Sequence, residues 1–188
     1  RQNATGTDLL AAYVLGMELT TRLSAAAKGA FHKVGFHPTG LVGTFGAAMT
    51  AAKLLGLDAG AMAHAQGIAL SLASGNLEFL QDGAGTKRLH PGWAASSGIT
   101  AAALAQHGMT GPRATYEGRF GLYASHLGAL AAECDLDSLT AGLGSVWETL
   151  DVAIKPLPAC HFTHACADAA SALSLEWGAL QAQGATLK

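Results

Sequence analysis

The stretch GFHPTGLVGTFGAAMTAA, residues 35–52, contains one histidine, one proline and no charged side chain. A second stretch, TKRLHPGWAASSGITAA at 86–102, again places His-Pro before a run of small, uncharged residues. Proline favours the first turn of a helix, so each His-Pro pair predicts that a helix begins there. Because glycine and alanine allow helices to approach closely, the two stretches predict a tightly packed helical protein.

Helix signals extend over most of the chain. Thr7 is the expected cap of a first helix over residues 8–30. Further helices are expected from Pro38 to Gly56, from Asp58 to about Gly75, from Pro91 to near Gly108, after Asp135 or Asp137, and over residues 163–183. Gly-rich loops are expected around 81–92 and 108–128, and only TLDVAIKPLPAC, residues 149–160, has an extended pattern. The predicted fold class is therefore all-α, with a short extended crossover near 149–158.

The charge and hydropathy of the chain exclude two classes of partner. Half of the 188 residues are hydrophobic, 13% are charged, and the net charge is −2, which offers no basic surface for nucleic acid. Three uncharged runs, 34–52, 59–77 and 89–112, approach the length of a membrane span. They contain histidines, prolines and amides, and Ala and Gly outnumber Leu, Ile and Phe. We therefore expect buried helices rather than membrane helices.

The cysteine content and the two ends of the chain bear on its origin. Three cysteines, an odd number, do not predict a disulfide framework, and a cytoplasmic location is the default expectation. The chain begins at Arg1 without an initiator methionine and ends at Lys188, just past an expected helix. Both ends resemble cuts through a longer protein.

The histidines and lysines of these segments indicate chemistry on an anion. His37 and His90 each directly precede an expected helix, whose first N–H groups and dipole favour negative charge. Lys87 lies in the expected Gly-rich loop before His90, and Lys155 directly precedes a proline. A carboxylate ligand needs cations, and proton transfer needs a group that titrates near neutral pH, as histidine does. An anionic small molecule and acid–base chemistry are the combined expectation.

Simpler interpretations compete with this one. His37 alone is more often a capping or solvent-facing histidine, and Lys87 alone a solvated loop residue. The glycines of GLVGTFG lack the spacing and the preceding strand of a nucleotide loop, so helix packing explains them better. A metal site would draw on CHFTHAC, that is, on Cys160, His161, His164 and Cys166. That set matches no zinc spacing well, and we expect neither a metal nor another cofactor.

Three segments together carry a resemblance to a known family. They are GFHPTGLVGTFGAAMTAAKLLGLD, TKRLHPGWAASSGITAAALAQHGMTGP and IKPLPACHFTHACADA, in this order and at these separations. The chain resembles the MmgE/PrpD family, which includes 2-methylcitrate dehydratase, cis-aconitate decarboxylase and iminodisuccinate epimerase. The resemblance implies that residues 1–150 are the central part of a helical domain. Residues 151–188 would be the crossover and helix that lead toward an α+β lid domain, which this chain lacks.

The resemblance also implies roles for individual residues. His37 matches the family's active-site histidine, and Lys87 and Lys155 match its two active-site lysines. We expect His37 to act as acid and base and the lysines to bind substrate carboxylates, so these three side chains should converge. Substrate-binding positions are implied at Thr86, His90 and Cys160. The Asp and Thr of an upstream family motif are not in this chain.

A lyase acting on a small di- or tricarboxylate is the function that the resemblance implies. The expected reaction is elimination of water, as in 2-methylcitrate dehydratase, with epimerase-like and decarboxylase-like chemistry as alternatives. Cys160 stands where the decarboxylase branch carries histidine, which favours the first two. A homodimer or higher oligomer is expected. The competing function, of another class, is an inactive helical fragment that serves as an assembly or binding module.

Overall fold

The computed structural model describes residues 3–184 and residue 186. The chain divides into two compact units, Arg1–Asp151 and Val152–Lys188. The first unit contains the α-helices and 3₁₀-helices through η3, and the second contains η4 and α9.

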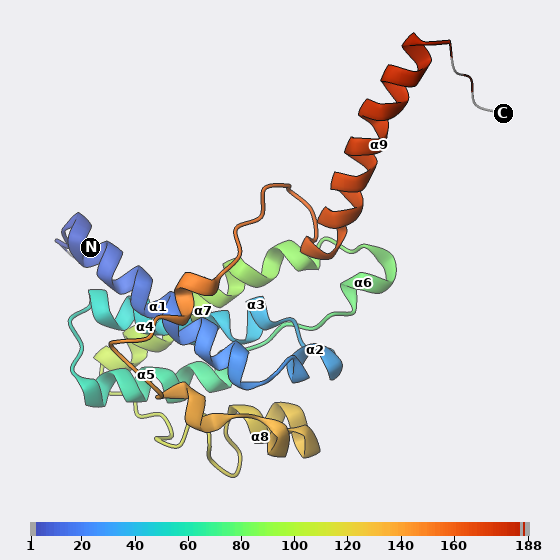
Figure 1. Ribbon diagram of the computed structural model, residues 1–188. Coiled ribbons are helices and arrows are strands. Elements are labelled where there is room, and N and C mark those ends of the chain that lie inside the picture. Colours follow the sequence, from blue (N-terminus) through green and yellow to red (C-terminus); the bar gives the residue numbers. More distant parts are fainter. Residues whose placement is uncertain (1–2, 185, 187–188) are drawn as a thin grey trace. The chain divides into compact units, whose positions relative to one another are not determined.

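The described part of the chain is all-α (Figure 1). Its α-helices are α1 (Gly6–Ala26), α2 (Ala30–Lys33), α3 (Pro38–Leu41), α4 (Gly43–Leu54), α5 (Ala59–Leu72), α6 (Phe79–Asp82), α7 (Thr86–Gln106), α8 (Leu122–Leu127) and α9 (His164–Ala182). Its 3₁₀-helices are η1 (Gly128–Glu133), η2 (Leu136–Leu139), η3 (Glu148–Asp151) and η4 (His161–Thr163). An isolated antiparallel bridge joins Phe36 and Asn76. The predicted fold class is confirmed.

Helix α4 is the centre of the first unit, where it packs against α1, α5 and α7. Phe45 of α4 is fully buried, and the side chains of Leu23 and Leu41 are equally inaccessible beside it. Small residues allow the helices to come this close. A Cβ added to Gly16 would lie 2.7 Å from the Gly46 carbonyl oxygen, and one added to Gly98 would lie 2.5 Å from the Ala48 nitrogen. Glycine is therefore required at both helix crossings.

Several helix ends differ from the sequence prediction. Helix α1 begins earlier than expected because Thr5, and not Thr7, forms a capping box with Asp8. Asp58 caps α5 as expected, but α5 ends at Leu72. Helix α7 begins at Thr86, so Pro91 lies inside it and does not open it. As the sixth residue of α7, Pro91 lacks the N–H of one helical hydrogen bond, and the helix nevertheless continues past it to Gln106.

Two predicted irregular segments contain helical turns, and one predicted helix is of another type. The expected loop at 81–92 contains the end of α6 and the start of α7, and the loop at 108–128 contains all of α8. The helix expected after Asp135 is a 3₁₀-helix, which Asp135 caps by accepting a hydrogen bond from the Ser138 N–H. The extended crossover near 149–158 is also shorter than predicted, since its first residues belong to η3.

A buried ion pair explains why the chain turns helical at η3. Glu18 and Arg22 of α1 are 2.6 Å apart and almost inaccessible to solvent. Arg22 donates to four backbone carbonyls, at Ser138, Leu139, Ala141 and Val146. Glu18 accepts from the backbone N–H of Glu148 and from both the N–H and the hydroxyl of Thr149. These contacts, which we call the α1 clamp, hold residues 138–149 against α1 and bend the chain where sequence predicts extension.

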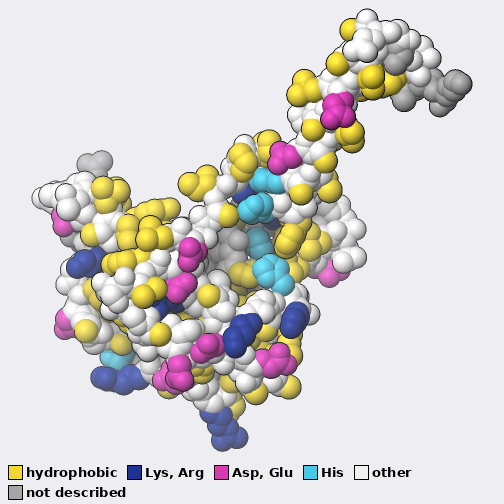
Figure 2. Space-filling view, viewed as in Figure 1, with side chains coloured by type: hydrophobic (Ala, Val, Ile, Leu, Met, Phe, Trp, Pro, Cys, Tyr) yellow, Lys and Arg dark blue, Asp and Glu magenta, His cyan; other side chains and the backbone are white. Residues whose placement is uncertain are grey.

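The first turns of α1 carry apolar side chains outside the core. Leu9, Leu10 and Tyr13 are each more than half exposed. Figure 2 shows hydrophobic side chains on the surface at the end of the molecule where α1 begins. In the part of the chain that the structure describes, each helix is too short or too polar to traverse a bilayer.

Two alanine substitutions on α7 test the packing argument. Gly98→Ala should lower the free energy of unfolding by about 1–3 kcal/mol, because its Cβ meets the α4 backbone. Gly92→Ala, on the exposed side of the same helix, meets nothing within 4 Å and should add about 0.5–1 kcal/mol through helix propensity. Urea unfolding measures both, and equal effects of the two substitutions would contradict close packing at Gly98.

The α1 clamp predicts a pH dependence of stability. Burial raises the pKa of Glu18, but hydrogen bonds from Thr149 and Arg22 outweigh it and lower this pKa to about 2. Because the folded pKa lies below the unfolded one, the stabilisation is complete above about pH 4.5 and disappears toward pH 2. Glu18→Gln should cost about 3 kcal/mol at pH 7 by leaving Arg22 without its charge partner. It should also flatten the loss of stability below pH 4.5, whereas Glu133→Gln, at an exposed carboxylate, should keep the wild-type slope.

Candidate functional site

A short antiparallel contact fixes the position of His37. Gly35 has a φ of +88°, which favours glycine and turns the chain into the bridge between Phe36 and Asn76. The His37 N–H then donates to the Gly75 carbonyl at 3.1 Å, and the Leu77 N–H donates to the Gly35 carbonyl at 2.9 Å. His37 is thereby held beside the segment that joins α5 to α6, and Pro38 begins α3 directly after it.

His90 reaches the same place from α7. Its side chain is buried, with 8% of its surface exposed. A Cβ on Gly40 would lie 2.5 Å from the Ser74 carbonyl oxygen and 3.3 Å from the His90 Cβ, so Gly40 lets α3 approach both segments. Gly75, at a φ of +130°, passes the ring of His90. The glycines of GFHPTG and of the 74–76 segment therefore make room for this histidine.

The two histidine rings are in direct contact. Their Nδ1 atoms are 2.7 Å apart, which is a hydrogen bond. The ring of Phe79 packs edge-on with both, at centroid distances of 5.4 Å from His37 and 5.7 Å from His90. The Lys87 ammonium lies 5.5 Å from the centre of the same Phe79 ring. One aromatic ring thus brings a predicted lysine and two predicted histidines together.

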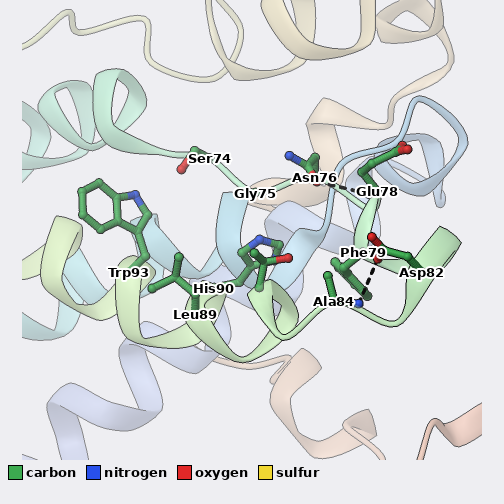
Figure 3. A pocket seen from close by; sticks show the side chains of 11 residues that line it. Ser74, Gly75, Asn76, Glu78, Phe79, Asp82, Ala84, Leu89, His90 and Trp93 are labelled. Carbon is green, nitrogen blue, oxygen red and sulfur yellow. Dashed lines mark hydrogen bonds between the residues drawn. The ribbon is translucent and has the colours of Figure 1, made fainter.

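An open hollow of about 640 Å³ lies next to this group (Figure 3). Two predicted site residues, Thr86 and His90, are in its lining. Figure 3 shows the His90 ring rising from α7 toward Gly75, with Leu89 and Trp93 on the same helix. The other residues of the lining are Ser74, Gly75, Asn76, Glu78, Phe79, Asp82 and Ala84. The volume is that of a small-molecule site.

The polar groups of the hollow are unevenly distributed. Two carboxylates, Glu78 and Asp82, belong to the lining, which contains no lysine or arginine among the described residues. Asp82 accepts a hydrogen bond from the Ala84 N–H, and the Asn76 side chain accepts one from the Glu78 N–H. An anion would therefore be repelled at the α6 end, and the histidines form the more favourable end.

His37 is uncharged at neutral pH. Burial lowers its pKa most, and the charges of His90, Lys87 and His32 lower it further, to about 4. A neutral imidazole has one nitrogen with a hydrogen and one with a lone pair, so it can accept a proton without prior deprotonation. This state suits a general base.

Comparison with known proteins places this site in a family. The model of the MmgE/PrpD N-terminal domain matches residues 1–135, which include His37, Phe79, Lys87 and His90. The chain belongs to the MmgE/PrpD family. The expected resemblance is thereby confirmed.

Several relatives of the chain carry the name cis-aconitate decarboxylase. The chain is 36% identical to cis-aconitate decarboxylase of Mus musculus over 171 residues, which are 89% of this chain and 34% of that protein. The human protein of the same name is 37% identical over the same shares of the two chains. Cis-aconitate decarboxylase of Aspergillus terreus is 30% identical over 163 residues, 85% of this chain and 33% of the relative. The chain spans about a third of the length of the relatives it matches.

The structure changes the setting of two predicted site residues. Lys87 is in the first turn of α7 and not in a loop, and its side chain is exposed. His90 lies within α7, so it does not precede a helix N-terminus. His37 does precede one, but α3 is only a single turn of four residues, which weakens the predicted role of the helix dipole.

The other predicted residues lie in the second unit. Lys155 is in the irregular segment 152–159, and Cys160 directly precedes η4. Their convergence with His37 stays a prediction. The rings of His161 and His164 are 4.9 Å apart, and within the described residues no three His, Cys, Asp or Glu side chains gather where they could hold a metal ion.

Sequence reasoning missed Phe79, Trp93 and the turn at Gly75 and Asn76. The Gly-Asn pair between two apolar segments is a turn signal that could have located the bridge. Phe79 and Trp93 have no comparable signal, because an aromatic residue in an apolar stretch predicts core and not a site.

The charge of Lys87 should be measurable at His37. Lys87→Met removes one of the charges that lower the pKa of His37, so this pKa should rise. It should stay below its ordinary value, because burial, the largest cause of the shift, remains. Arg88→Met is the matched control on the same turn, since Arg88 does not contribute to the shift. Proton NMR of the imidazole C–H signals against pH gives both values. An unchanged His37 titration in Lys87→Met would show that the ammonium lies too far away to act on it.

Proposed function

We propose that the chain carries part of the active site of a lyase that acts on a small di- or tricarboxylate. The observation that carries the proposal is the part-buried His37–His90 contact at the edge of a hollow of about 640 Å³. Two coupled imidazoles beside a space of this size suit proton transfer to or from a small bound substrate. Membership of the MmgE/PrpD family supports the same reaction class.

The proposed chemistry passes through negative charge next to a carboxylate. Either a proton leaves the carbon beside the carboxylate, or carbon dioxide leaves and a proton returns to carbon. Neutral His37 is the proposed proton acceptor, and its protonated form is the donor. The ammonium groups of Lys87 and Lys155 are proposed to bind the substrate carboxylates and to stabilise the charge as it develops.

The lining of the hollow limits how such a substrate would bind. Glu78 and Asp82 oppose a carboxylate at the α6 end. We therefore place the substrate carboxylates toward His90 and Lys87, and the less charged part of the substrate toward Leu89 and Trp93. This orientation puts the carbon that exchanges a proton near the histidine pair.

Two reactions within this class of lyase are each favoured by a different observation. The relatives are named cis-aconitate decarboxylases, which favours decarboxylation of cis-aconitate. Cys160, in the position where the resemblance gives the decarboxylase branch a histidine, favours removal of water from a 2-methylcitrate-like substrate. Both need the same proton-transfer group, so the proposal for His37 holds for either reaction.

Turnover assays on the full-length natural polypeptide test the proposal. Cis-aconitate and 2-methylcitrate are supplied separately, and carbon dioxide release and loss of the hydroxyl are followed. His37→Gln should lower kcat about 10²- to 10⁴-fold, since glutamine cannot transfer a proton near neutral pH. Lys87→Ala should lower kcat/KM about 10²- to 10³-fold.

Arg88→Ala is the matched control for Lys87, and it should keep wild-type kinetics. Near-wild-type turnover of His37→Gln across the pH range would refute its role as acid and base. A Lys87→Ala variant with lowered thermal stability and full activity would show that the lysine is structural.

A second candidate function is favoured by the exposed apolar side chains of α1. Leu9, Leu10 and Tyr13 form a surface that would be covered if the chain served as an assembly module. Sedimentation velocity of the wild type and of Leu10→Glu distinguishes this function. Self-association that Leu10→Glu abolishes, in a full-length polypeptide without turnover on either substrate, would support the module and contradict the lyase.

A further inference from the structure

The His37–His90 contact has an unusual geometry for two histidines. The atoms that meet are both Nδ1, at 2.7 Å. Each Nδ1 either carries a hydrogen or presents a lone pair, and two hydrogens cannot point at each other over this distance. One hydrogen therefore lies between the rings. The ring that donates it fixes the state of the ring that accepts it.

The outer nitrogens of the pair are left without protein partners. The described hydrogen bonds of His37 and His90 use the two Nδ1 atoms and the His37 backbone, and neither Nε2 has a bond. His90 belongs to the lining of the hollow, and His37 packs against Phe79, which belongs to the same lining. Binding of a proton at the Nε2 of one ring can therefore be coupled to release of a proton from the Nε2 of the other ring.

We propose that His37 and His90 form a one-hydrogen relay, in which His90 is the positioning partner of His37 and connects it to the hollow. In the first state His37 donates through Nδ1 and has a lone pair on Nε2, and His90 has its hydrogen on Nε2. In the second state His90 donates through Nδ1, His37 has its hydrogen on Nε2, and the His90 Nε2 has the lone pair. The catalytic use of the relay rests on the proposed function, whereas its geometry does not.

The step between the two states balances. A proton binds to the His37 Nε2, the hydrogen on the His37 Nδ1 moves to the His90 Nδ1, and the hydrogen on the His90 Nε2 leaves into the hollow. Each ring is neutral before and after, and the charge lies on one ring at a time in between. The reverse sequence returns a proton from the hollow to the His37 side, so one pair serves both directions of proton transfer.

The surroundings of His37 disfavour its charged form. Burial, His90, Lys87 and His32 all disfavour the cationic form of His37 and lower its pKa. Glu78 and Asp82 are the carboxylates in the lining that His90 shares. The Lys87 ammonium lies at the Phe79 ring, which packs against both histidines.

Nitrogen NMR of the 188-residue chain with ¹⁵N-labelled histidine tests the relay directly. A hydrogen shared between two Nδ1 atoms gives a scalar coupling between the two ¹⁵N nuclei across the hydrogen bond. We expect this coupling for His37 and His90 in the wild-type chain. Its absence in a chain whose circular dichroism is helical would overturn the inference.

Substitutions at His90 separate the relay from simple packing. His90→Phe keeps the ring and should abolish the coupling, raise the pKa of His37 toward its ordinary value, and release its Nδ1 hydrogen. His90→Asn offers an amide near the Nδ1 position and should preserve the wild-type tautomer of His37 without relaying a proton. His107→Phe, the same change at the exposed residue that directly follows α7, should leave every His37 signal unchanged. A His37 titration that is identical in wild type and His90→Phe would show that His90 only fills space.

Kinetics of the full-length natural polypeptide then test the use of the relay. His90→Asn should lower kcat at least tenfold with little change in KM, and should displace the acidic limb of the pH profile. Wild-type kcat and pH profile in His90→Asn would overturn the relay even if turnover itself confirms the lyase. Failure of the lyase is recognised differently, by a wild-type protein that shows the coupling and turns over neither substrate.

Discussion

The close approach of α4 to its neighbours is the constraint on which the first unit depends. Gly16, Gly46 and Gly98 bring backbones within a distance that no Cβ would permit. With helices this close, alanines and a few large side chains such as Phe45 are enough to exclude water from the core. The low aromatic content of the sequence is a consequence of this geometry. Gly40 and Gly75 allow a similarly close approach of backbone segments, and there two histidines come into contact.

Local signals explain how much of the fold was predictable from sequence. Helix-forming periodicity, the cap at Asp58 and the first-turn proline at position 38 act over a few residues, so they identified most helices correctly. Helix α7 was misplaced because the preference of proline for a first turn outweighed the helical potential of TKRL. The sequence did not predict the bend at η3, because the bend depends on a hydrogen bond from the Glu148 N–H to the Glu18 carboxylate. These two residues are 130 positions apart in the sequence. No local pattern encodes such a contact.

In the candidate site, too, local sequence signals predicted some features, and others depend on long-range packing. The His-Pro motifs indicated His37 and His90 individually, and the resemblance connected them with Lys87. Their mutual contact came only from the structure, because it requires the bridge between Phe36 and Asn76 and the narrow passage at Gly75. The acidic end of the hollow was also unforeseen, since Glu78 and Asp82 appear in the sequence as ordinary charges near a turn. Spacing therefore predicted the chemical groups, and packing determined how they are joined.

The α1 clamp has a consequence for the motions of the chain. Residues 140–149 have little regular structure, and such a segment would ordinarily open often and exchange its amide hydrogens rapidly with solvent. Here the amides of Glu148 and Thr149 donate to a carboxylate that is itself buried in an ion pair. Their hydrogens can leave only when the ion pair is exposed to water, which makes the opening of this segment as costly as that of a helix. A stretch that looks like a loop thus moves with α1 as one cooperative unit.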